Sequence, residues 1–228
     1  MDTSPEIQKI KSPAPAARAA TAAHVLGVIS IVLLLVWLLH YREGIRLDSP
    51  NAFRIFNVHP FLMFFGFIFM AGEAMMAYKT TARAEKTAQK LGHALIHSIA
   101  IALGIVGLHA VFKFHDQLNI PNMYSLHSWI GIATFSIFCL QWLIGLAVFL
   151  LPGASAGTRV RAAPWHVSVG RVLLFMAISA ALTGLIEKAT FLKLRHNGEG
   201  RLVNFLALAI LLFGISVDLS VSLAYNKL

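Results

Sequence analysis

Long apolar segments constrain this chain more than any other feature of its sequence. Six of them follow one another, at 22–40, 58–78, 91–112, 122–151, 165–186 and 202–224. A helix needs about 20 mostly apolar residues to cross the hydrocarbon core of a membrane, and hydrophobic residues make up 57% of this chain. The segments lack the alternation of membrane β-barrel strands and are too long to be such strands. The sequence therefore predicts an all-α membrane protein with six transmembrane helices.

The connections between these segments are short, which predicts one membrane domain over residues 21–228 and no separate soluble domain. Residues 1–20 are polar and rich in alanine and proline, so we expect a disordered N-terminal tail. No small-residue cleavage site follows a short apolar core in this region. Segment 22–40 is therefore expected to be the first retained span and not a signal peptide.

The formal net charge is +9, and membrane topology explains it better than binding to nucleic acid. With both termini on one side of the membrane, that side carries 11 lysine and arginine residues and the other side carries eight. Cytoplasmic loops are enriched in these residues. The distribution predicts cytoplasmic termini, contacts with membrane lipid and no nucleic-acid partner.

Cysteine content narrows the redox chemistry that is open to the chain. Cys139 is the only cysteine, which excludes an intramolecular disulfide, a four-cysteine iron–sulfur cluster and a thiolate zinc site. No glycine-rich dinucleotide fingerprint follows a strand, so nothing predicts NAD or flavin binding. If electrons pass through this protein, a diffusible donor must bring them.

Four of the ten histidines lie within about one turn of the N-terminal end of an apolar segment, namely His59, His93, His127 and His166. Consecutive membrane helices run in opposite directions. His59 and His127 are therefore expected at one depth, and His93 and His166 at the opposite depth. Two pairs of imidazoles at two levels of a four-helix core are what two stacked haems with two histidine ligands each require.

Glycine repeats one spacing after two of these histidines. It lies four and 18 residues after the histidine, at Gly131 and Gly145 in one segment and at Gly170 and Gly184 in another. These positions share the histidine face of a helix, where a small residue allows a flat macrocycle to lie close to the backbone. The same pattern also fits ordinary contact between membrane helices.

Three polar residues leave alternatives open. Glu73 and Gln141 each lie 14 residues after a paired histidine, about 21 Å deeper in the membrane. Three roles are open to Glu73 and Gln141. Each side chain could hydrogen-bond a haem or its ligands, carry a proton, or link two helices. His97 lies one turn after His93 on nearly the same face, and is the rival ligand in that segment.

Two other functions compete with a haem protein that transfers electrons by itself. The i, i+4 pair His93 and His97 leaves open a metal-ion transporter. Such a site normally needs ligands converging at one depth with carboxylates beside them, whereas the histidines here divide between two depths. The second alternative is that the chain is a haem subunit of another reductase.

Several motifs in this order resemble the cytochrome b561 family, and most closely its plant transmembrane ascorbate-dependent members. The motifs are Asn57-Val58-His59-Pro60, Gly72-Glu73-Ala74-Met75 with Tyr78-Lys79, Lys113-Phe114-His115, Tyr124-Ser125-Leu126-His127-Ser128-Trp129 and Pro164-Trp165-His166. The resemblance covers about residues 24–215. It implies six transmembrane helices, with two b haems held by helices 2 to 5.

The resemblance also implies ligands, a reaction and an assembly. It makes His59 and His127 the ligands of the non-cytoplasmic haem, and His93 and His166 those of the cytoplasmic haem, which favours His93 over His97. Single electrons would pass from cytoplasmic ascorbate to monodehydroascorbate or ferric chelates across the membrane. The expected assembly is a homodimer, in an endomembrane such as that of the vacuole or in the plasma membrane.

Substrate contacts follow from the same resemblance, and no catalytic residue beyond the haem ligands is implied. The positions that bind cytoplasmic ascorbate are similar to Lys86, Lys90 and Arg159, of which Arg159 rests on its spacing to His166 rather than on matching neighbours. The positions of the outer site are similar to Phe114, His115 and Tyr124. The positive charge of Lys86, Lys90 and Arg159 agrees with this role, because an anionic donor needs positive charge beside the inner haem. The same three cations also fit a role in topology or contact with anionic lipid.

Overall fold

The computed structural model describes residues 14–80, 85–195 and 197–225 of the chain. Within these ranges the protein is helical and contains no strand. Six helical segments are long and apolar enough to cross a membrane: Ala14–Tyr41, Ala52–Ala77, Lys86–Leu118, Leu126–Leu150, Ala156–Phe191 and Gly198–Ala224. The predicted all-α class and six spans are confirmed.

Three of the six spans contain a stretch of π-helix. The elements in chain order are α1 (Ala14–Val36), η1 (Trp37–Tyr41), α2 (Ala52–Phe56), α3 (Val58–Phe61), η2 (Leu62–Phe69), α4 (Met70–Thr80), α5 (Lys86–Leu118), α6 (Leu126–Gly145), η3 (Leu146–Leu150), α7 (Ala156–Phe191) and α8 (Gly198–Tyr225), where η marks a π-helix. The π-helix η2 begins at Leu62, two residues after Pro60, which has no backbone N–H to donate to the regular α-helical ladder.

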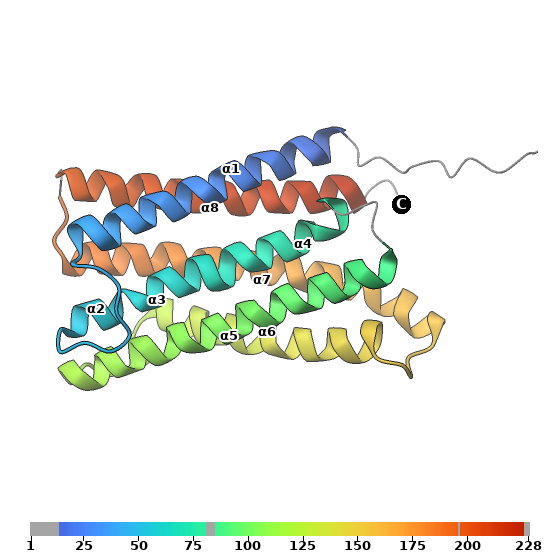
Figure 1. The fold of residues 1–228 in the computed structure, drawn as a ribbon, viewed down its shortest axis with the longest axis horizontal. Coiled ribbons are helices and arrows are strands. Elements are labelled where there is room, and N and C mark those ends of the chain that lie inside the picture. The colour runs from blue at the N-terminus through green and yellow to red at the C-terminus, as the bar shows by residue number, and fades with distance from the viewer. Residues whose placement is uncertain (1–13, 81–84, 196, 226–228) are drawn as a thin grey trace, which may run out of the picture.

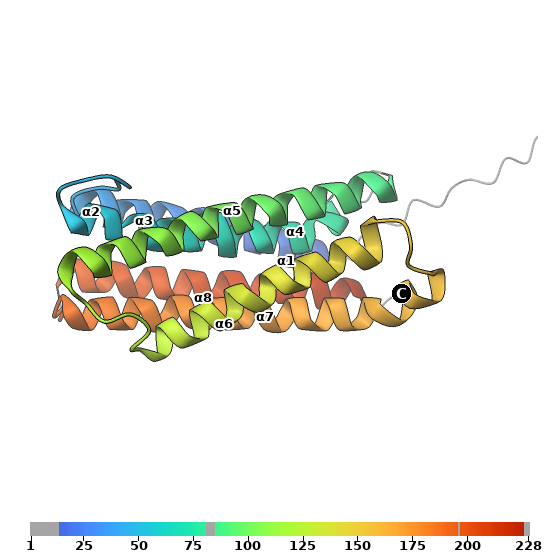
Figure 2. The same ribbon diagram turned by 90° about the horizontal axis from the view of Figure 1, so that it is seen from below.

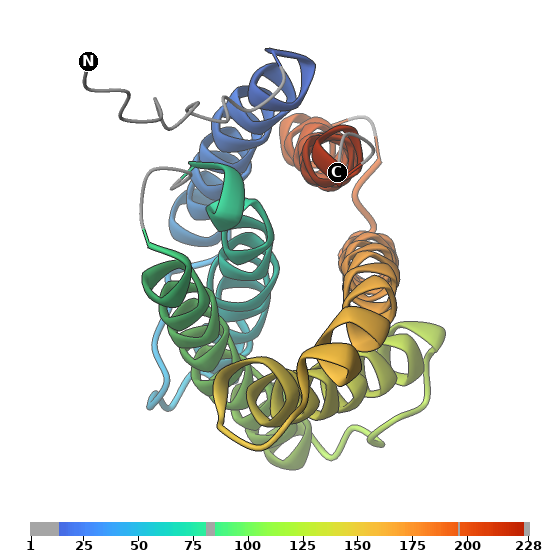
Figure 3. The ribbon, with the colours of Figure 1, turned by 90° about the vertical axis from the view of Figure 1, so that its right-hand side faces the viewer.

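The long helices lie side by side along the length of the molecule (Figure 1). Seen from one end, they follow one another around an oval in the order α1, α4, α5, α6, α7, α8 (Figure 3). We call the end where α1 begins and α8 ends the terminal face, and the other end the opposite face. The connection between α5 and α6 lies at the opposite face (Figure 2), so α5 and α6 start at different faces.

The helices extend beyond the apolar segments that predicted them. The structure differs from the expected tail over 1–20, because α1 begins at Ala14, and the expectation is wrong for residues 14–20. Alanine, the strongest helix former, dominates this stretch. Residues 1–13 lie outside the described residues. With 33 and 36 residues, α5 and α7 are each about 50 Å long and exceed the roughly 30 Å hydrocarbon core.

The fourth span begins later than the predicted segment 122–151. Met123 has a positive φ of 59°, and α6 starts at Leu126 after the N-cap Ser125. The Ser125 hydroxyl accepts a hydrogen bond from the backbone N–H of Ser128, while the Ser128 side chain accepts from the Ser125 N–H. This capping box satisfies two backbone donors and fixes the start of the helix one residue before His127.

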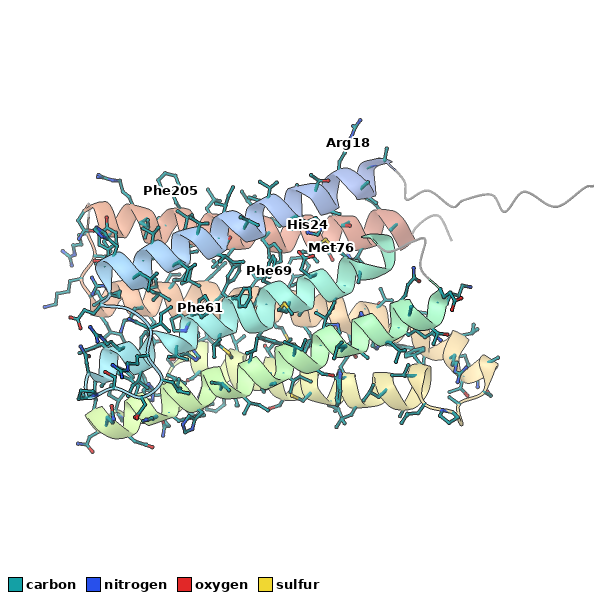
Figure 4. The ribbon with its side chains drawn as sticks, in the orientation of Figure 1. Arg18, His24, Phe61, Phe69, Met76 and Phe205 are labelled. Atoms are coloured by element: carbon teal, nitrogen blue, oxygen red, sulfur yellow. The ribbon has the colours of Figure 1, made fainter. Side chains whose placement is uncertain are left out.

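Polar contacts in the apolar bundle join helices that are distant in sequence. His24 on α1 contacts Glu73 on α4, with 2.9 Å between His24 Nδ1 and Glu73 Oε1, and Figure 4 places His24 between these helices. Arg171 on α7 donates two hydrogen bonds to Asp218 on α8, at 2.6 and 3.1 Å. Phe205, in contrast, points away from the bundle (Figure 4) and is exposed, as expected of a side chain facing lipid.

Candidate functional site

Two pairs of histidines lie near the two ends of the bundle. The ring centroids of His59 on α3 and His127 on α6 are 6.0 Å apart near the opposite face. Those of His93 on α5 and His166 on α7 are 6.2 Å apart toward the terminal face. The sequence predicted these two pairings from the direction of each helix. All four rings are partly buried.

The separation within each pair suits one iron between two imidazoles. A metal–imidazole nitrogen bond is about 2.0 Å long and an imidazole centroid lies about 1.1 Å from its nitrogen, so two rings on opposite sides of one iron have centroids about 6 Å apart. The observed separations of 6.0 and 6.2 Å match this value. The residues present therefore fit two haems with two histidine ligands each.

Hydrogen bonds to backbone carbonyls orient three of the four rings. The Nδ1 atom of His59 lies 3.1 Å from the carbonyl oxygen of Gly107, and that of His93 lies 2.9 Å from Ala74 O. His127 Nδ1 lies 2.7 Å from the carbonyl oxygen of Ala180. A carbonyl oxygen only accepts, so Nδ1 carries the hydrogen in each case. This tautomer leaves Nε2 without a hydrogen in all three rings, as in most metal-binding histidines.

Glycine residues on α6 and α7 allow the histidine rings to approach the neighbouring helix. A Cβ atom at Gly184 on α7 would lie 2.7 Å from Cε1 of His127, and one at Gly145 on α6 would lie 3.2 Å from Cε1 of His166. Each helix thus supplies one histidine and, 18 residues later, the glycine on which the histidine of the other helix packs. The expected glycine at this spacing accommodates the partner ring. Phe149 also packs against His166, with 5.1 Å between ring centroids.

A cavity of about 360 Å³ lies beside the pair nearer the terminal face. Its lining includes His93 and His166 and is otherwise mostly apolar, with Phe67, Phe138 and Leu173 among the lining residues. A cavity that is lined mainly by apolar side chains and has few polar groups is typical of cofactor sites.

His97 borders the same cavity without matching the geometry of the ligand pairs. Its ring lies 4.4 Å from that of His93, one turn away on the same helix, and it packs at 5.2 Å against Phe138. Its buried Nδ1 atom has no hydrogen-bond partner among the described residues. No group of three or more histidine, cysteine, aspartate or glutamate residues placed to hold a metal ion occurs in the part of the chain that the structure describes.

Glu73 and Gln141 take different partners. Glu73 contacts His24 on α1 and so links two helices, which was one of the roles left open for it. Gln141 donates through Nε2 to the backbone carbonyl of His166 at 2.8 Å and lines the cavity. It therefore reaches the backbone of one of the paired histidines.

Two of the three predicted cations at the terminal face meet at the end of η3. Lys90 Nζ donates to the carbonyl oxygen of Phe149 at 3.3 Å, and Arg159 Nε donates to that of Val148 at 3.1 Å. Cations at the C-terminal end of a helix stabilise its free carbonyl groups. Lys90 also lines the cavity, whereas Lys86 lies one turn earlier and is exposed.

The three residues predicted for the outer site lie together at the opposite face. The His115 ring lies 5.8 Å from Phe114 and 6.3 Å from Tyr124. Phe114 is buried, and Tyr124 is 50% exposed, so a diffusible molecule would meet Tyr124 before Phe114. The Tyr124 hydroxyl donates to Glu187 at 2.8 Å. Burial, together with this carboxylate, raises the pKa of Tyr124 to about 12, so the phenol stays protonated at neutral pH.

Sequence reasoning missed three residues at this face. Asn122 Oδ1 lies 2.8 Å from His115 Nδ1, Glu187 accepts from Tyr124, and the Lys188 ammonium lies 3.7 Å from the ring centroid of Phe56. In the sequence, Lys188 counts only as one of the eight basic residues on the side opposite the termini. The signal that would have identified it is its position 22 residues after His166, which a helix with about 3.6 residues per turn places within about 40° of the histidine face.

Comparison with known proteins gives one consistent family. The model of the eukaryotic cytochrome b561 family matches residues 58–192. An ascorbate-specific transmembrane electron transporter of Zea mays is 42% identical over 86% of this chain and 85% of its own length. A transmembrane ascorbate ferrireductase of Arabidopsis thaliana is 43% identical over 88% of this chain and 85% of its own length. A transmembrane ascorbate-dependent reductase of Sus scrofa is 38% identical over 91% of this chain and 83% of its own length. The chain belongs to the eukaryotic cytochrome b561 family.

Proposed function

We propose that this protein binds two b haems and carries single electrons across the membrane, from ascorbate at the terminal face to monodehydroascorbate or a ferric chelate at the opposite face. The observation that carries the proposal is the pair of imidazole separations, 6.0 and 6.2 Å, near the two ends of the bundle. The relatives named for ascorbate-dependent electron transport and ferric reduction support the same reaction.

In this proposal His93 and His166 hold one haem, and His59 and His127 hold the other. Each haem would supply one-electron exchange, and a haem held by two histidines would carry electrons rather than bind oxygen. The protein provides orientation through the carbonyl groups of Ala74, Gly107 and Ala180, which fix the Nδ1–H groups. The cavity beside His93 and His166 has a mostly apolar lining, and an apolar environment of this kind tunes redox potential.

Lys90 and Arg159 bind the anionic donor in this proposal, and Lys86 adds positive charge one turn further out. Both Lys90 and Arg159 already donate to carbonyl groups at the end of η3, and Lys90 also lines the cavity. Their positive charge favours an anion such as ascorbate at this face. His115 and Tyr124, with Phe114 beneath them, form the acceptor surface at the opposite face.

We further infer that the terminal face is cytoplasmic, since more of the lysine and arginine residues belong to it. A homodimer in an endomembrane such as that of the vacuole, or in the plasma membrane, completes the proposal. Protease accessibility of a C-terminal tag in sealed vesicles tests the orientation.

A spectrum of the purified protein tests the central proposal. We expect two low-spin b haems per chain by quantitative pyridine haemochrome assay, and we expect ascorbate to reduce most of what dithionite reduces. Absence of haem contradicts the proposal. Two haems that dithionite reduces and ascorbate does not would instead identify a haem subunit that depends on another reductase.

Neutralising the two cations should weaken reduction by ascorbate without loss of haem. For the Lys90→Met and Arg159→Met double variant we expect the half-saturating ascorbate concentration to rise about tenfold or more, because each cation would contribute a charge-assisted hydrogen bond. Stopped-flow absorbance of the haem bands measures this. Arg161→Met, which removes an exposed charge from the same face, is the matched control. Equal effects of the control and the double variant would contradict the assignment.

A further inference from the structure

Lys188, near the end of α7, lies against a cluster of phenylalanine rings at the opposite face. Its Nζ atom is 3.7 Å from the ring centroid of Phe56, 5.5 Å from that of Phe53 and 5.7 Å from that of Phe114. The side chain is partly buried. An ammonium over aromatic faces is attracted by the ring electrons, so the three rings hold this charge in one place.

Two other cations at this face have carboxylate partners, whereas Lys188 lies over aromatic rings. Arg42 pairs with Glu199, and Lys113 pairs with Asp48. Among residues 14–80, 85–195 and 197–225 no carboxylate forms an ion pair with Lys188. The adjacent Glu187 instead accepts the hydroxyl of Tyr124. A cation in a membrane helix without an anion is costly and is usually functional.

Lys188 also links the histidine pair to the predicted acceptor surface. Gly184, one turn earlier on α7, packs on the ring of His127. Phe56, under the ammonium, lies 6.3 Å from the ring of His59. Phe114, on the other side of Lys188, lies 5.8 Å from His115. The ammonium thus lies between the site where electrons would leave the protein and the surface where an acceptor would dock.

We propose that Lys188 binds the carboxylate of a ligand at the opposite face, and that a polycarboxylate chelate of ferric iron is this ligand. The inference rests on the proposed function, because it names the chemistry by which the acceptor site would hold its substrate. Arg42 at the same face is paired with Glu199, so Lys188 supplies the positive charge to which a carboxylate of the chelate would bind. A propionate of the haem held by His59 and His127 is the other source of a carboxylate.

A redox-inert chelate provides the test. Binding of gallium(III) citrate, an analogue of ferric citrate that accepts no electron under these conditions, is measured by isothermal titration calorimetry on the purified protein in nanodiscs. Lys188→Met keeps the length and the apolar stem over the rings and removes the charge, whereas Lys188→Arg restores the charge. Lys113→Met, which removes a paired lysine from the same face, is the matched control.

We expect Lys188→Met to weaken gallium citrate binding about tenfold or more, Lys188→Arg to recover most of it, and Lys113→Met to change it less than threefold. Unchanged binding together with a shifted midpoint potential of one haem in Lys188→Met, recovered by Lys188→Arg, would identify the propionate as the carboxylate. If binding and both potentials are unchanged, or if Lys113→Met weakens binding as much as Lys188→Met, the proposal is wrong. Binding of gallium citrate needs no electron transfer. The measurement therefore tests the role of Lys188 even if the haem spectrum contradicts the proposed function.

Discussion

Replacing His59 or His127 with alanine is expected to remove the same one of two haem signals, and His93→Ala or His166→Ala is expected to remove the other. The reason is the geometry of the pairs, whose ring centroids lie 6.0 and 6.2 Å apart. Each haem depends on both of its ligands, so loss of either imidazole leaves the iron with one protein ligand. Reduced-minus-oxidised spectra, with haem per chain quantified, measure the result.

Double variants sharpen this test. Residues that act as a unit show strongly non-additive effects. Removing His59 and His127 together should therefore cost no more haem than removing either one, whereas removing His59 and His93 should cost both signals. His109→Ala, at an exposed position on α5, is the matched control and should keep both. Loss of different signals by His59→Ala and His127→Ala would overturn the pairing.

The same series separates His93 from its rival. His97 packs edge-on against His93, so His97→Ala should shift the spectrum or potential of one haem and retain the haem itself. If His97→Ala removes the signal that His93→Ala leaves intact, His97 is the ligand. Exogenous imidazole should restore the signal only in the variant that has lost a true ligand.

The spans and the histidine pairs were predictable because they depend on properties that the sequence carries directly. Apolar length determines which segments cross the membrane, and the alternation of direction determines the depth of each histidine. The spacing of 18 residues also predicted that Gly145 and Gly184 lie on histidine faces. Which ring packs on which glycine depends on how neighbouring helices are rotated, and a single helix face does not contain that information.

Partners on other helices were harder to predict for the same reason. Periodicity gave the depth of Glu73 but not the identity of the helix beside it, and its partner His24 comes from α1, outside the four helices considered. The burial of Phe114 and the position of Lys188 over the rings depend on α2, a short helix in what the sequence presented as a connection. None of the three π-helices was predicted, because their hydrogen-bond pattern depends on the packing of neighbouring helices as well as on local residues such as Pro60.

A methyl group at Gly184 should be among the most damaging small changes in the bundle. A Cβ atom there would lie 2.7 Å from Cε1 and 2.8 Å from Nδ1 of His127, closer than two such atoms approach in real structures. The ring cannot move aside freely, because its Nδ1 atom donates to the carbonyl of Ala180 at 2.7 Å. Gly184→Ala should therefore displace the His127 imidazole and lower the occupancy of the haem that it shares with His59.

The other glycines provide a graded series for this prediction. Gly145→Ala would place Cβ 3.2 Å from Cε1 of His166, a contact that a shift of a few tenths of an ångström relieves, so a smaller effect on the other haem is expected. Gly92→Ala, next to His93, meets no atom within 4 Å and should be neutral or slightly stabilising, because alanine favours a helix. Haem per chain and the two midpoint potentials should rank Gly184→Ala as most affected and Gly92→Ala as least. A Gly184→Ala protein with both haems at wild-type occupancy and potential would contradict the prediction.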